Sequence, residues 1–204
     1  MSTAVRLRAL ARRPPPAAPP QRCDLCAGPL PAGHRHLLDA ADGTALACAC
    51  GACALLFGHQ AAGRYRLVPR RRIRLAGHRI DDLLWAALGV PVHLAFFVPD
   101  EGDGTATAGY PGPLGAPCAA VDAELWQELA AGLPEQARPA AGVEALLVDR
   151  QADEHWIVPV DDCRRLVAVL RAHWKGLTGG PAARARITDF FRELATDAPA
   201  QGEL

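Results

Sequence analysis

Five of the seven cysteines in this 204-residue chain lie between residues 23 and 53. They include two C-x-x-C units, one formed by Cys23 and Cys26 and the other by Cys50 and Cys53. Two residues between thiols allow a tight turn to direct both sulfur atoms at one metal ion, and two such units supply four thiolates in a tetrahedral shell. We therefore predict a metal site at these four cysteines. Because four protein ligands leave no open coordination position, we expect the ion to be structural.

Zinc is the ion we expect, because structural zinc sites are the commoner use of this spacing. Iron is the alternative, since the same four-thiolate shell holds one iron atom in rubredoxin-type electron carriers and tetrahedral thiolate suits both metals. Buried or disulfide-bonded thiols are the alternative to any metal, and a reducing compartment disfavours disulfides.

Three neighbouring residues have roles that the spacing leaves open. Cys48 can replace Cys50 in the shell or lie just outside it. His34 or His36 can be a ligand beside three cysteines, a donor to the ligands, or a solvated loop residue. We favour the last two roles for both histidines, because four cysteines already complete the shell.

The cysteine pairs must be positioned by a small module, which we assign to residues 21–60. We expect a zinc-ribbon or rubredoxin-like hairpin, in which short strands come from HRHLLD and TALACA. Residues 1–20 contain four arginines followed by PPPAAPP, a composition that predicts a disordered tail.

Residues 61–204 have the pattern of an α+β domain in which helices pack on an antiparallel sheet. The apolar runs 92–98 and 105–110 predict one hairpin, and 143–148 with 155–160 predict a second. Residues 61–80 are expected to form an exposed strand or a linker. Four helices are expected, with these residues at their starts: Asp81 or Asp82, Asp122, Asp161 or Asp162, and Pro181.

The charge of the chain is zero overall but unevenly placed. Residues 1–80 hold 13 arginines against 3 acidic residues, whereas residues 81–204 hold 19 acidic residues. The two halves can dock on each other, or the basic half can face an acidic partner. The arginine-rich segment 64–74 has only one aromatic residue, Tyr65, for stacking on bases, so we do not expect nucleic-acid binding.

Nothing in the sequence predicts catalysis, a cofactor-binding motif or a membrane span. The chain has no P-loop, G-x-S-x-G or G-x-G-x-x-G motif, and Cys163 falls on the apolar stripe of a predicted helix, where a thiol is usually inert. No apolar run reaches the roughly 18–20 residues that would span a bilayer, and the N-terminus lacks the apolar stretch of a secretory signal. We expect a cytoplasmic protein that is not an enzyme.

Several segments together resemble one uncharacterised bacterial family, and these are RCDLCAGPL, CACGACALLF, LGVPVHLAFFV, YPGPLG, VPVDDCRRLV and HWKGLTGG. The resemblance covers about residues 21–195. Members of this family, a domain of unknown function met mainly in actinobacteria, look to be encoded beside genes for uptake nickel–iron hydrogenases. The resemblance implies a role in the assembly or function of such an enzyme, and it brings no catalytic residue with it.

The function we expect is therefore that of a non-catalytic, metal-binding accessory or adaptor protein. Its partner would be a protein, by resemblance a hydrogenase subunit or maturation factor. A rubredoxin-like iron electron carrier is the alternative, and a zinc-ribbon nucleic-acid-binding protein is the second alternative.

Overall fold

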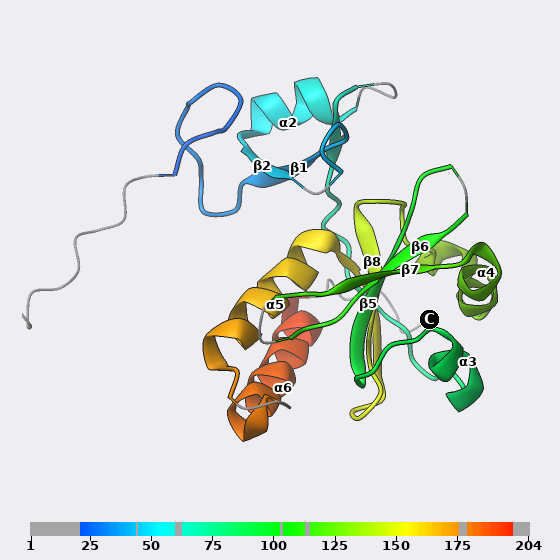
Figure 1. The fold of residues 1–204 in the computed structure, drawn as a ribbon. Coiled ribbons are helices and arrows are strands. Elements are labelled where there is room, and N and C mark those ends of the chain that lie inside the picture. The colour runs from blue at the N-terminus through cyan, green and yellow to red at the C-terminus, as the bar shows by residue number, and fades with distance from the viewer. Residues whose placement is uncertain are drawn as a thin grey trace, which may run out of the picture.

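The structure is a computed structural model, and it describes residues 21–43, 45–59, 63–102, 104–112, 115–175 and 179–197. The expected tail, residues 1–20, lies outside these ranges. The described residues form two antiparallel sheets with packed helices, which confirms the predicted α+β class (Figure 1). The elements in chain order are β1 (Arg35–Asp39), β2 (Leu46–Ala49), α2 (Gly51–Gly58), β3 (Tyr65–Leu67), β4 (Ile73–Arg74), α3 (Asp82–Ala87), β5 (Leu94–Pro99), β6 (Ala106–Gly109), β7 (Cys118–Val121), α4 (Ala123–Ala131), η1 (Glu135–Ala137), β8 (Glu144–Asp149), β9 (Glu154–Pro159), α5 (Val160–His173) and α6 (Gly180–Asp197).

The larger sheet has six strands in the order β4-β9-β8-β5-β6-β7. Both predicted hairpins are confirmed, because β5 pairs with β6 and β8 pairs with β9. The pairing of β5 with β8 joins the two hairpins at the centre of the sheet. Strand β8 is buried along its whole length, which requires that both faces of the sheet be covered.

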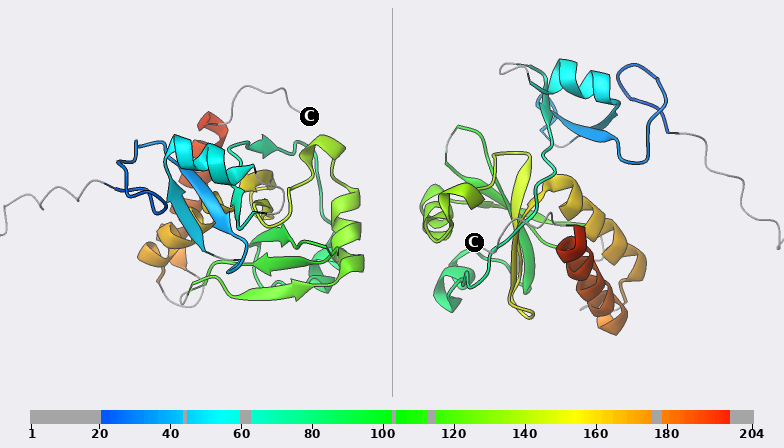
Figure 2. Two further views of the ribbon diagram at one scale, coloured as in Figure 1. Left: turned by 90° about the horizontal axis from the view of Figure 1, so that it is seen from above. Right: turned by 180° about the vertical axis from the view of Figure 1, so that it is seen from behind.

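Helices cover both faces of this sheet. Helices α3 and α4 lie on one face and α5 and α6 on the other, as Figures 1 and 2 both show. Side chains alternate between the two cores along β5, β8 and β9, as expected for a period of two. In β8, Leu146 and Val148 pack toward α3 and α4, whereas Ala145 and Leu147 pack toward α5 and α6.

The starts of the predicted helices are confirmed in part. The Asp81 carboxylate accepts hydrogen bonds from the backbone N–H groups of Leu83 and Leu84 and so caps α3 as expected. The predicted cap of α5 is wrong, because this helix begins at Val160 and both Asp161 and Asp162 lie within its first turn. Their side chains are turned to other partners, since Asp161 contacts His36 and Asp162 contacts Arg72.

The smaller sheet has the order β2-β1-β3, with α2 packed beside it. Its two predicted strands, β1 and β2, are confirmed, and β3 extends this sheet beyond residue 60. A separate apolar cluster connects the smaller sheet to the α+β part, with Leu38 of β1 and Val68 packed against Val143 and Val160. The cysteine-bearing part is therefore anchored to the α+β part through β1 and the segment after β3.

Candidate metal centre

The first cysteine pair lies in a tight turn that precedes β1. The Cys23 N–H donates to the Gly28 carbonyl at 2.8 Å, and the Ala27 N–H donates to the Cys23 carbonyl at 2.8 Å. Ala27 has a φ of 58°, in the left-handed region, which lets the chain reverse directly after Cys26. This backbone geometry holds the Cys23 and Cys26 side chains on the inside of one turn.

The second pair lies at the start of helix α2, which the sequence did not predict. Cys50 is the N-cap residue of this helix and Cys53 lies in its first turn. In a helix, residues three apart share a face, so both side chains point in the same direction. A helical start for the second pair differs from the expected zinc-ribbon or rubredoxin-like hairpin, in which both pairs would lie in turns.

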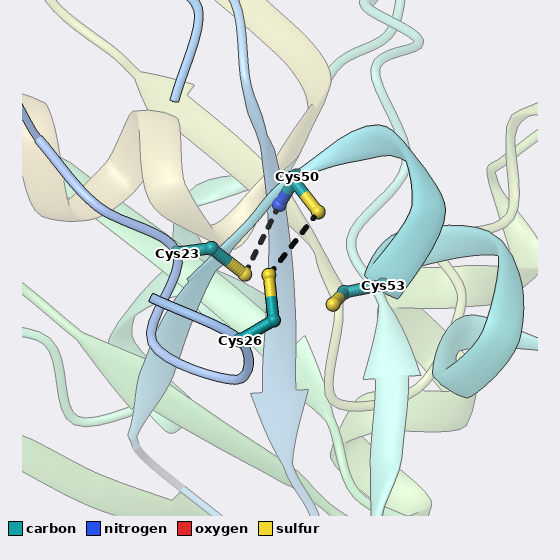
Figure 3. Close-up of side chains that lie close together, drawn as sticks. All are labelled: Cys23, Cys26, Cys50 and Cys53. Atoms are coloured by element: carbon teal, nitrogen blue, oxygen red, sulfur yellow. Dashed lines mark hydrogen bonds between the residues drawn. The ribbon is translucent and has the colours of Figure 1, made fainter. Parts of the chain in front are cut away.

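The four sulfur atoms of Cys23, Cys26, Cys50 and Cys53 converge (Figure 3), and all lie within 4.8 Å of one another. The Sγ atoms of Cys26 and Cys50 are 3.8 Å apart. Two thiolates bound to one tetrahedral zinc ion at about 2.3 Å would lie about 3.8 Å apart. The donor set and this separation therefore fit a four-thiolate metal site.

Backbone N–H groups support negative charge at the centre of this cluster. The Cys50 N–H donates to the Cys23 Sγ at 3.4 Å. Burial raises the pKa of the Cys23 thiol, but the backbone N–H groups of Cys50, Cys26 and Leu25 outweigh this effect and lower the pKa to about 6. Burial, together with contacts to the other thiols, raises the pKa of Cys53 to about 12. Four thiols this close cannot all ionise without a cation to offset their charge.

The cluster is half inside the protein and half at its surface. Cys23 and Cys53 are buried, whereas Cys26 is exposed and Cys50 is partly exposed. The apolar core around them is small, and its buried members are Cys23, Leu37, Ala49, Cys53 and Ala54. Two of these five residues are themselves candidate ligands, so a bound ion would tie together residues that belong to this small core.

Cys48, His34 and His36 form a second group beside the four cysteines. The Cys48 Sγ and one ring nitrogen of each histidine also lie within 4.8 Å of one another. Burial, followed by the charges of Asp24 and Cys23, raises the pKa of the Cys48 thiol. The sequence placed these residues near the metal site but did not indicate that they converge on one another.

The two remaining thiols, Cys118 and Cys163, lie apart from both groups, and two further histidines contact partners elsewhere in the α+β part. Cys163 is 1% exposed in the core beneath α5, where burial raises its pKa well above the ordinary value. Cys118 is exposed on β7. His155 contacts His78, with 2.8 Å between their Nδ1 atoms, and His173 contacts the Val169 carbonyl.

The arginines of segment 64–74 form contacts with other parts of the same chain. Five of its six arginines contact a carboxylate, in the pairs Arg64–Asp39, Arg66–Glu101, Arg71–Glu144, Arg72–Asp162 and Arg74–Glu154. The sixth, Arg70, donates to the carbonyls of Gly33 and His34. Four of the carboxylates belong to the acidic half of the chain, so the two halves of opposite charge do contact each other.

Comparison with known proteins identifies the class to which the chain belongs. Residues 22–198 match a family of unknown function, DUF5947. The match covers most of the chain, so the protein belongs to this family. No curated protein and no solved structure matches the chain. Among the residues that the structure describes, no helix has both the length and the apolar character needed to cross a membrane.

Proposed function

We propose that this protein is a non-catalytic accessory protein that holds one zinc ion at Cys23, Cys26, Cys50 and Cys53. The observation that carries the proposal is the convergence of four thiol side chains with a separation that suits tetrahedral zinc. Four protein thiolates occupy every position of such a shell, so the ion serves the fold and not a reaction. The small apolar core around the cluster supports this structural role.

The accessory role requires a protein partner, and helix α2 offers a surface for it. Leu55 is 69% exposed and Leu56 is 65% exposed, on the helix that begins with Cys50. Apolar side chains this exposed on one helix are typical of contact surfaces. The internal pairing of the arginine segment weighs against nucleic acid as the partner. The resemblance drawn from the sequence implies a nickel–iron hydrogenase subunit or maturation factor.

Affinity capture from a native host tests this partner. The wild-type protein should recover hydrogenase subunits or maturation factors, and the double variant Leu55→Asp with Leu56→Asp should recover at least tenfold less. Leu83→Asp is the matched control, since Leu83 is 85% exposed on the separate helix α3. Wild-type capture without any hydrogenase-related protein, or equal capture by both variants, would contradict the proposal.

A second candidate function, a rubredoxin-like iron electron carrier, is favoured by the exposure of Cys26. An exposed ligand brings the metal close to the surface, where an electron could pass to a partner. Such a protein would be red when it is produced with iron available, and it would lose its colour on reduction. A colourless protein that contains one zinc ion would exclude this candidate.

A further inference from the structure

His34, His36 and Cys48 lie on one side of the hairpin formed by β1 and β2. His36 and Cys48 are directly opposite each other in the register of the two strands. His34 is two residues before His36 and therefore points to the same side in extended backbone. The Nε2 atoms of the two histidines are 3.1 Å apart.

The hydrogen bonds of the two rings determine which nitrogen atoms carry protons. The Nδ1 atom of His36 is 2.7 Å from a carboxylate oxygen of Asp161, and the Nδ1 atom of His34 is 3.3 Å from the Pro31 carbonyl. Neither an ionised carboxylate nor a carbonyl can donate, so each Nδ1 must be the donor. Both Nε2 atoms of the neutral rings then present lone pairs, and these face each other.

Two lone pairs at this distance repel each other unless a cation lies between them. Two imidazole nitrogens bound to one tetrahedral zinc ion at about 2.0–2.1 Å would lie about 3.3 Å apart. The observed separation of 3.1 Å is close to this value. A shared proton is the competing occupant, but it would give no role to the thiol of Cys48, which converges on the same point.

The surroundings have the features of a metal site. Histidine ligands usually donate their second ring N–H to a carboxylate or a backbone carbonyl, and Asp161 and Pro31 provide these two acceptors. A pocket of about 320 Å³ is lined by both histidines and Asp161. All three residues are partly exposed, whereas two of the four cysteines, Cys23 and Cys53, are buried.

We propose that His34, His36 and Cys48 form a second metal site, which binds a borderline-soft divalent cation of the Zn²⁺ type. Two imidazoles and one thiolate suit Zn²⁺ and its first-row neighbours and do not suit Mg²⁺ or Ca²⁺. Three protein ligands leave a fourth position for water or another ligand. This ion is therefore exchangeable, and Asp161 acts as a positioning residue that orients the ring of His36.

The test uses the full-length protein after dialysis against a mild chelator, with its zinc content measured first. Cobalt(II) is then added as a spectroscopic probe, with zinc release monitored throughout. One Co²⁺ ion per chain should bind while zinc is retained, with the thiolate-to-cobalt charge-transfer absorption of a Cys48 ligand. Cys48→Ser should abolish this absorption, and His36→Gln should weaken Co²⁺ binding at least tenfold. Asp161→Asn should weaken binding roughly 10- to 100-fold and leave the absorption in place.

Cys118→Ser is the matched control, because Cys118 is an exposed thiol on the far strand β7 and should leave both signals unchanged. Retained zinc in each variant shows that the four-cysteine part is still folded. The proposal is overturned if wild-type protein with zinc in place binds no Co²⁺, or if Cys48→Ser keeps the charge-transfer absorption. Failure of the four-cysteine site gives a different result, which is zinc missing before any cobalt is added.

Discussion

Replacing Cys53 by serine tests the assigned ligands most sharply. Structural zinc sites have apparent binding free energies of about 10–16 kcal/mol, so the average share of each of four thiolates is about 2.5–4 kcal/mol. Losing this share corresponds to roughly 100- to 1,000-fold weaker metal binding. Cys53 is only 6% exposed, so water cannot easily take its place in the shell. We expect Cys26→Ser, at an exposed ligand that water can replace, to lose less affinity than Cys53→Ser.

The structural consequence of Cys53→Ser should be confined to the cysteine-bearing part. The buried cluster there contains only one large aliphatic side chain, Leu37, besides two alanines and two of the candidate ligands. The six-stranded sheet has two apolar cores of its own and should stay folded. Far-UV circular dichroism should therefore fall partially and not to the level of the unfolded chain.

The assay is competition for zinc with a chromophoric chelator, after dialysis has removed exchangeable ions. Cys50→Ser should behave like Cys53→Ser, whereas Cys48→Ser and the remote Cys118→Ser should retain the tightly bound ion. The reasoning fails if Cys48→Ser releases that ion, or if Cys53→Ser holds zinc as tightly as the wild type does.

Two further predictions concern the α+β part. Arg71→Ala leaves the fully buried carboxylate of Glu144 without its ion pair and should lower the free energy of unfolding by about 3 kcal/mol. Arg79→Ala breaks an exposed ion pair and should lower it by less than about 1 kcal/mol. Equal losses for the two variants in urea unfolding would contradict this prediction. Burial, with the nearby His78, lowers the pKa of His155 from its ordinary value of 6.5 to about 4. The unfolded chain therefore binds more protons between these values, and the free energy of unfolding falls as the pH drops through that window, by at most about 3.5 kcal/mol. His155→Asn should flatten this dependence in urea unfolding at a series of pH values, and an unchanged slope would refute the assignment.

The parts of the fold that could be predicted from the sequence are those with a regular pattern of apolar residues. The two hairpins of the large sheet have short segments rich in apolar residues with turn residues between them, and α5 has apolar side chains at a spacing of three and four. Helix α2 was missed because it has only eight residues and both of its faces are apolar, so its sequence, GACALLFG, has no helical period.

The candidate site could be predicted only where ligand spacing is local. Each C-x-x-C unit consists of four consecutive residues, so it can be recognised without knowing how distant parts of the chain fold. The second group depends on the strand register that places His36 opposite Cys48, and on a contact between His36 and Asp161 that spans 125 positions. That contact also explains why the predicted cap of α5 was wrong. The adjacent sequence alone makes Asp161 a good candidate for a helix cap, but its side chain contacts His36.

The metal content of the purified wild-type protein tests the central claim most directly. After dialysis against a mild chelator, elemental analysis should find one zinc ion per chain in a colourless protein, because four converging thiolates hold the ion too tightly for a mild chelator to remove. Iron at the same stoichiometry, with a red colour that bleaches on reduction, would make the protein an electron carrier. A folded chain without any tightly bound metal would contradict the proposed site at Cys23, Cys26, Cys50 and Cys53.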